Sequence, residues 1–164
     1  MRVVLTGTSH LFTVTPMSTK NELPLISESR VRVRYAETDQ MGVAYYANYL
    51  VWFEVGRSQY CNDCGFSYRD MERETGLFMI VAEARCRYQT PAKYEDELIV
   101  RTRITELTRR TVRFGYEIIR TGDGTRVAKG DTLHVLTTPE GRPSSVPEKY
   151  RAMFGKTAQP GAKK

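Results

Sequence analysis

The sequence has little histidine, little cysteine and no long apolar run among its 164 residues. No stretch of uncharged apolar residues reaches the length of a membrane span, so a soluble, cytoplasmic protein is expected. The three cysteines, Cys61, Cys64 and Cys86, are an odd number without a regular spacing, as is usual in a reducing compartment. Neither a transmembrane helix nor a disulfide scaffold is expected.

The shortage of histidine argues against hydrolases that use a Ser-His or a Cys-His pair. His10 lies near the N-terminus and His134 lies inside a strand pattern, and no G-x-S-x-G motif accompanies either of them. The pair Cys61-x-x-Cys64 falls at the C-terminal end of a predicted helix, where the helix dipole does not favour a thiolate. Zinc requires more ligands than these residues supply, so we interpret both cysteines as packing residues.

Positive charge is in excess: 25 Lys and Arg oppose 19 Asp and Glu, a formal net charge of +6. Such a surface suits partners that carry phosphate, such as a nucleotide-containing small molecule, an anionic lipid or nucleic acid. No nucleic-acid-binding motif is present, and no nucleic-acid partner is expected. Lys93, Arg109 and Arg110 occupy predicted turns, from which long cationic side chains reach phosphate.

The length predicts a single domain with a sizeable core. Residues 1–28 are rich in Thr, Ser and Pro and lack a sustained period, so they are expected to form a loosely ordered extension, within which Met17 is an alternative start. The domain is expected over residues 29–155, followed by a basic tail at 156–164.

Alternation of Val and Arg from Arg30 predicts a half-buried strand that ends at residues 37–39. Residues 46–64 then show helical spacing, and Gly65 follows as a stop signal. Trp52 and Val55 lie off the main apolar stripe, so the helix is apolar on more than one side and is expected to be enclosed by other structure. The stripe consists of Tyr49, Leu50, Phe53, Tyr60 and Cys64.

A predicted loop with about one helical turn, residues 65–76, precedes a long alternating region. This region predicts four consecutive strands in an antiparallel meander, because the connections between them are short. The strands are expected at 79–90, 96–107, 111–121 and 125–138, and a short helix at 146–154. An α+β fold is expected, with an antiparallel five-stranded sheet wrapped around one long central helix, which is the hotdog fold in outline.

Asp39 is the first catalytic candidate. Its position before Gln40-Met41-Gly42 is typical of a turn aspartate that accepts a hydrogen bond from its own backbone two residues on. The same position, near the start of a buried helix, places a carboxylate beside free backbone N–H groups and the positive end of the helix dipole. Such an arrangement provides a base next to donors for an oxyanion.

Glu54 is the second candidate, because it interrupts an apolar helical segment. Arg57 lies three residues on, and an ion pair across one helical turn is one interpretation of this carboxylate. The other interpretation is that Glu54 faces a substrate cleft or a partner subunit.

The segment RVRYAETDQMGVAYYANYLVWFEVGR, residues 32–57, resembles the signature of the 4-hydroxybenzoyl-CoA thioesterase family. It is more similar to the acyl-CoA thioesterase branch that is associated with the bacterial Tol–Pal cluster. The shared features are the strand ending in Thr-Asp, the Gly-Val pair, the Asn-Tyr pair and F-E-x-x-R. The resemblance extends over residues 30–140.

The resemblance implies hydrolysis of an acyl- or aroyl-CoA thioester by a homodimer or homotetramer with sites at subunit interfaces. No metal or separate cofactor is expected, because coenzyme A is part of the substrate. The catalytic aspartate of the family corresponds to Asp39, Glu54 is a supporting candidate, and the backbone N–H of Tyr46 is the expected oxyanion donor. Substrate contacts are expected from Tyr45, Asn48, Tyr49, Lys93, Arg109 and Arg110.

One departure is that many members of this branch carry histidine where this chain has Tyr46. Two alternative functions stay open: a hotdog-fold enoyl-CoA hydratase or dehydratase, and an acyl-CoA-binding module without catalysis. The hydratases usually rely on a histidine at the helix start, where this chain has tyrosine.

Overall fold

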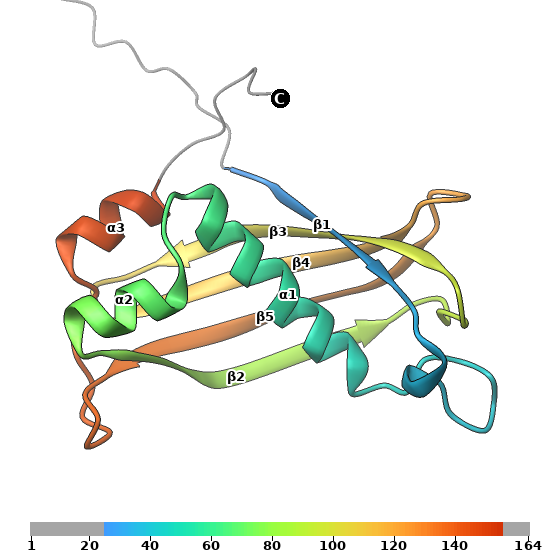
Figure 1. The fold of residues 1–164 in the computed structure, drawn as a ribbon, viewed down its shortest axis with the longest axis horizontal. Helices are drawn as coiled ribbons and strands as arrows, with labels where there is room; N and C mark the ends of the chain where they lie inside the picture. The colour runs from blue at the N-terminus through green and yellow to red at the C-terminus, as the bar shows by residue number, and fades with distance from the viewer. Residues whose placement is uncertain (1–24, 156–164) are drawn as a thin grey trace, which may run out of the picture.

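The computed structural model describes residues 25–155, with one five-stranded antiparallel sheet and helices on one of its faces (Figure 1). The expectations for Met17, His10 and the tail at 156–164 lie outside the described residues. The strands are β1 (Ser27–Arg32), β2 (Phe78–Tyr88), β3 (Glu97–Leu107), β4 (Thr111–Arg120) and β5 (Arg126–Thr137), and the helices are α1 (Asn48–Asp63), α2 (Tyr68–Thr75) and α3 (Glu148–Phe154). Tyr35–Glu37 forms a 3-10 turn.

The five strands and the antiparallel sheet are confirmed, and so is the predicted meander for β3, β4 and β5, but the expected pairing of β2 with β3 is wrong. The strand order is β1-β3-β4-β5-β2, so β2 pairs with β5 and β3 pairs with β1. The connection at residues 89–96 is a crossover rather than a hairpin. The N–H of Gln89 still donates to the carbonyl of Val127 at 2.9 Å, whereas that of Glu95 donates to Val33 at 3.0 Å, at the other side of the sheet.

Two local boundaries also differ from the predictions. The loop expected at 65–76 contains α2, whose first turn is capped by the Ser67 hydroxyl, which accepts from the Asp70 N–H at 3.1 Å. Gly76 ends α2 in the left-handed conformation, with φ 66°. The extension predicted over 1–28 is too long, because β1 already begins at Ser27.

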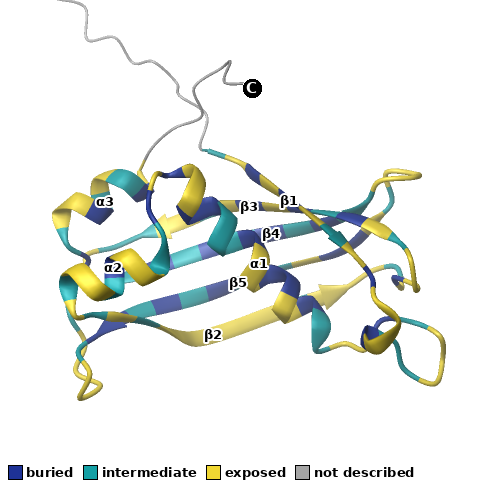
Figure 2. Ribbon diagram, in the orientation of Figure 1, coloured by how far each residue is buried: buried dark blue, intermediate teal, exposed yellow. Residues whose placement is uncertain are grey.

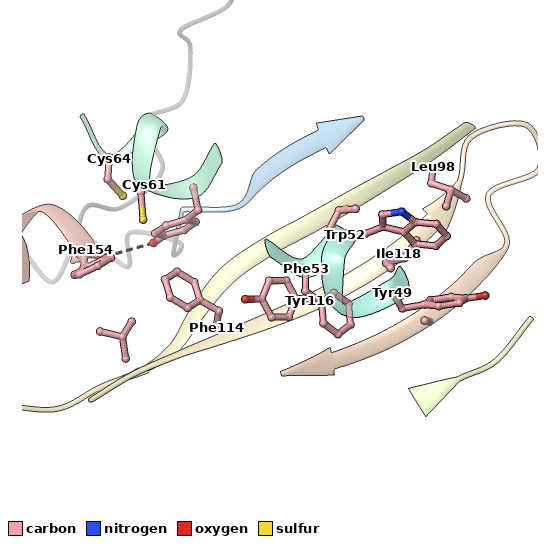
Figure 3. Close-up of a cluster of buried hydrophobic side chains, with 14 of the residues drawn as sticks. Tyr49, Trp52, Phe53, Cys61, Cys64, Leu98, Phe114, Tyr116, Ile118 and Phe154 are labelled. Carbon is pink, nitrogen blue, oxygen red and sulfur yellow. Dashed lines mark hydrogen bonds between the residues drawn. The ribbon is translucent and has the colours of Figure 1, made fainter. Parts of the chain in front are cut away.

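Helix α1 has sixteen residues and lies across the sheet. Gly56 allows a close crossing, because a Cβ at this position would lie 2.4 Å from Thr102 Oγ1 and 2.9 Å from Val100 Cγ1. About one turn before Gly56, the Phe53 ring stacks on Tyr116 of β4 with centroids 4.3 Å apart (Figure 3). The buried residues of α1 are Tyr49, Trp52, Phe53, Gly56, Tyr60 and Cys61.

The predicted apolar stripe of α1 was partly wrong, since Trp52 is buried and Leu50 is exposed. A second apolar side does exist: Val51 keeps 49% of its surface exposed, and Val55 is exposed as well. The neighbouring edge strand β2 is also largely uncovered, as Figure 2 shows by its yellow colour, and Val81 on it is 50% exposed. An apolar surface therefore runs from α1 to the edge of the sheet.

The two cysteines of the C-x-x-C pair are buried at the end of α1. Burial raises the pKa of the Cys61 thiol to about 12, which keeps it protonated and unreactive near neutral pH. No helix in residues 25–155 is long and apolar enough to cross a membrane.

His134 occupies the buried face of β5, as expected of a sheet residue. Its Nε2 lies 2.8 Å from Thr132 Oγ1, and its ring meets Phe114 edge to face at 5.4 Å. Burial, with a smaller contribution from the positive charge of Arg57, lowers the pKa of His134 to about 3. The ring is therefore neutral in the folded protein at neutral pH.

This neutral histidine predicts a loss of stability in mild acid. Between its unfolded pKa of about 6.5 and the folded value, the unfolded chain binds a proton that the folded chain does not. Lowering the pH from 7 to 5 is therefore expected to reduce the free energy of unfolding by about 2 kcal/mol through this group. Urea unfolding at both pH values should show a smaller decrease in His134→Gln. If the free energy of unfolding fell equally with pH in wild type and His134→Gln, His134 would not be the group responsible.

Candidate active site

A hollow of about 300 Å³ lies at the N-terminal end of α1. It is formed where the loop before α1 and the first turn of α1 meet the end of β2 and the start of the crossover. Its lining residues are Asp39, Met41, Val43, Ala44, Tyr46, Tyr49, Tyr88, Gln89, Thr90 and Pro91. Asp39 is the only carboxylate among these residues.

Asp39 uses one carboxylate oxygen to shape its own loop. Its Oδ1 accepts a hydrogen bond from the Met41 N–H at 2.8 Å, which is the turn contact expected from the sequence. Its carbonyl accepts from the N–H of Gly42, whose φ of 73° suits glycine. Oδ2 has no hydrogen-bond partner in the described part of the chain. One oxygen thus orients the carboxylate while the other is left for a ligand.

Backbone donors lie directly before α1, at the positive end of its dipole. The Tyr45 N–H is already used, because it donates to the carbonyl of Glu37 at 2.8 Å. The N–H groups of Tyr46 and Ala47 have no acceptor within residues 25–155. The carbonyl of Tyr46 accepts from the Tyr88 hydroxyl at 3.1 Å, which ties this segment to β2.

Glu37 is a site residue that the sequence analysis missed. Its carboxylate accepts from the backbone N–H and the guanidinium of Arg34 at 2.8 and 3.0 Å, and from Trp52 Nε1 at 3.3 Å. Its carbonyl accepts from the Tyr45 N–H and from Asn48 Nδ2, each at 2.8 Å. Glu37 therefore connects the chain leading to Asp39 with the first turns of α1.

Electrostatics keep this buried carboxylate ionised. Burial raises the pKa of Glu37, but the hydrogen bonds from Arg34 and Trp52 outweigh burial and leave the pKa below its usual range. The contact with Trp52 joins residues fifteen positions apart, so no local pattern in the sequence indicates it.

Replacing Glu37 with Gln is expected to lower kcat about tenfold, because a misplaced catalytic loop reacts more slowly. The glutamine amide would direct an N–H group at the donors of Arg34 or Trp52 and loosen the attachment of the loop to α1. The measurement is kcat per folded enzyme. Glu95→Gln is the matched control, since Glu95 pairs with Arg32 on the exposed surface. Equal kcat in Glu37→Gln and wild type would show that Glu37 has no positioning role.

Several predicted substrate contacts lie at this end of the molecule. The Tyr49 hydroxyl accepts from the Ala92 N–H at 3.3 Å, and its ring is buried. Lys93 is exposed and pairs with Val43 through an isolated β-bridge. Tyr45 is exposed too and lies against the ring of Tyr46, at 4.4 Å between centroids.

Glu54, Arg109 and Arg110 do not line the hollow that contains Asp39 of the same chain. Glu54 accepts from Ser58 Oγ at 2.8 Å and forms no ion pair with Arg57 in the described chain, so the interpretation as an ion pair is wrong. Arg109 and Arg110 lie in the β3–β4 turn near α3, at the end of the sheet away from the start of α1 (Figure 1). No group of three or more His, Cys, Asp or Glu side chains within residues 25–155 is placed to hold a metal ion.

Comparison with known proteins assigns a family to this arrangement. The model of the thioesterase-like superfamily matches residues 33–154. The chain belongs to this superfamily. The chain is similar to the acyl-CoA thioesterase YbgC of Haemophilus influenzae, with 31% identity over 126 residues that cover 76% of this chain and 90% of the relative. YneP of Bacillus subtilis strain 168 is 38% identical over 129 residues, which cover 79% of this chain and 90% of YneP.

Solved structures of thioesterases share the fold. The DHNA-CoA thioesterase of Staphylococcus aureus has a TM-score of 0.75 and 30% identity, over 79% of this chain and 88% of that one. The 4-hydroxybenzoyl-CoA thioesterase of Pseudomonas sp. strain CBS-3 has a TM-score of 0.72 at 24% identity, over 78% and 98%, which shows a common fold. The resemblance seen in the sequence is therefore confirmed.

Proposed function

We propose that this thioesterase-like protein hydrolyses an acyl- or aroyl-CoA thioester to the free acid and coenzyme A. The observation that carries the proposal is that Asp39 and Tyr46 line one hollow. Within residues 25–155, one carboxylate oxygen of Asp39 and the N–H groups of Tyr46 and of the next residue, Ala47, have no hydrogen-bond partner. A base or nucleophile beside preorganised backbone donors is what acyl transfer requires. The names of the YbgC relatives support coenzyme A as the leaving group.

Two routes use these groups. In one, Asp39 takes a proton from water, whose oxygen then attacks the thioester carbonyl. In the other, Asp39 itself attacks and forms an anhydride that water hydrolyses. In both, the backbone N–H groups stabilise the oxyanion, the carbon–sulfur bond breaks, and coenzyme A leaves as a thiolate.

We further propose that two copies associate through the edge strand β2. The edge strand β2, with Val81, and the apolar face of α1, with Val51 and Val55, are exposed, and a second sheet edge would cover them. Antiparallel pairing of the two β2 strands makes one continuous sheet, which wraps around both α1 helices. This completes the central-helix arrangement expected from the sequence.

This pairing also relates Arg109 and Arg110 to the hollow. Phe78 begins β2 at the end of the sheet that holds the β3–β4 turn, and Tyr88 ends it at the hollow. Antiparallel pairing about a two-fold axis therefore brings the β3–β4 turn of one copy to the end of the sheet where Asp39 of the other copy lies. There the two arginines are available to the phosphates of coenzyme A. Cys61, Cys64 and Cys86 form no disulfide within residues 25–155, which supports a cytoplasmic location.

The test is release of free thiol from short, long and aromatic acyl-CoA esters. Turnover of at least one of them is expected. Hydration of an enoyl-CoA without thiol release would favour the hydratase alternative, and binding of acyl-CoA without any turnover would favour the binding module. Either result would refute the thioesterase proposal.

A further inference from the structure

A second hollow, of about 580 Å³, lies on the face of the sheet opposite the helices. In β3 and β4 the residues packed toward the helices are those such as Val100, Phe114 and Tyr116. Because side chains alternate along a strand, Arg103, Arg113 and their neighbours project from the other face. The hollow thus lies outside the helix-covered core and shares no lining residue with the hollow at Asp39.

The lining of this outer hollow is strongly basic: six cationic side chains accompany only two carboxylates, Glu117 and Asp131. Asp131 is already paired with Arg85 and Arg113. The cationic residues are Arg85, Arg87, Arg101, Arg103, Arg113 and Lys129.

Three of these cations remain without a carboxylate. Within residues 25–155, Arg87, Arg103 and Lys129 form no ion pair, whereas Arg101 pairs with Glu28 at 2.7 Å. Arg87 and Lys129 are directly opposite each other in the pairing of β2 with β5. The Cβ atoms of such neighbours are about 5 Å apart, so both side chains can contact the same ligand.

Gly115 is a small residue in the lining of this outer hollow. It stands opposite Arg103 on β3 and Asp131 on β5, in the middle of the sheet. Its φ is not in the left-handed region, so the backbone does not require glycine here. A Cβ at this position would lie 2.7 Å from Thr105 Cγ2, so glycine leaves room for the Thr105 methyl group. Gly115 and Thr105 both line the hollow.

We propose that the outer hollow binds a small molecule carrying a diphosphate group, at a site separate from the thioesterase hollow. Unpaired guanidinium groups bind phosphate oxygens in pairs, and the volume is in the range of small-ligand pockets. A long nucleic acid fits less well, because Glu28, Glu83 and Glu117 border or line the basic surface. Neither Asp39 nor thioester turnover is needed for this binding.

The experiment is titration calorimetry of the full chain with pyrophosphate, ADP and coenzyme A at moderate salt. Pyrophosphate and ADP are expected to bind, and the double variant Arg87→Gln/Arg103→Gln to weaken both at least about tenfold. Competition between coenzyme A and pyrophosphate in wild type would show that coenzyme A, the product of the thioesterase, is a ligand of the outer hollow. Binding of ADP without competition by coenzyme A would show that the ligand is another nucleotide.

The matched control is Arg30→Gln/Arg142→Gln, which removes the same charge from two exposed arginines that do not line the hollow. Equal weakening in both double variants would refute the site, since net charge alone would then explain binding. Absence of pyrophosphate and ADP binding to wild type, or tighter binding of duplex DNA than of either, would also overturn it. Thiol release by the Arg87→Gln/Arg103→Gln variant should stay at the wild-type level, which separates this test from that of the thioesterase.

Discussion

Asp39→Asn is expected to lower kcat for thioester hydrolysis at least about a hundredfold. Asparagine has the size of aspartate, and its Oδ1 still accepts the hydrogen bond from the Met41 N–H that shapes the turn. What disappears is the basicity and negative charge of the oxygen left for the ligand. Folding and substrate binding should therefore survive, and circular dichroism with a substrate-binding measurement checks both.

The comparison with Glu54→Gln makes this result specific. Glu54 is exposed on α1, and within residues 25–155 its carboxylate accepts only from Ser58, so its loss of charge should reduce kcat moderately at most. A turn aspartate without a catalytic role predicts nearly unchanged turnover in Asp39→Asn, because Asn supports the same local bonds. A larger loss at Glu54 than at Asp39 would move the catalytic role to the helix.

Val81→Lys is expected to separate the proposed pair and to reduce kcat/KM more than about tenfold. Val81 is on the uncovered strand β2, where two strands paired about a two-fold axis would place lysines near one another. Loss of the pair removes the partner's Arg109 and Arg110 from the substrate. Light scattering coupled to size-exclusion chromatography gives the mass, and thiol release gives the activity.

Ile26→Lys is the matched control, since Ile26 is 50% exposed, like Val81, but lies beside β1 at the opposite edge of the sheet. It should keep both the mass and the activity of wild type. A wild-type protein that is already monomeric and active would refute the proposed pair. So would a Val81→Lys variant that keeps its partner.

Much of the secondary structure follows from local pattern. Strands such as β4 have the period-two alternation of half-buried strands, although β2 is exposed along most of its length. Gly65, with φ 94°, follows the end of α1 as its position predicts. His134 was recognised as a strand residue because its neighbours alternate. The family was recognisable because residues 32–57 are contiguous, and contiguous residues form the loop and the helix start at the hollow.

Features that depend on neighbours along the chain could therefore be predicted: most strand and helix positions, the turn at Asp39 and the family. The pairing of β2 with β5, the burial of Trp52 rather than Leu50, and the hydrogen bond from Trp52 to Glu37 became evident only in the folded chain. The outer hollow likewise needs Arg87, Arg103 and Lys129 from three different strands. Hydrogen bonds and charges between distant residues depend on how strands are ordered in space, and periodicity within one segment carries no information about that order.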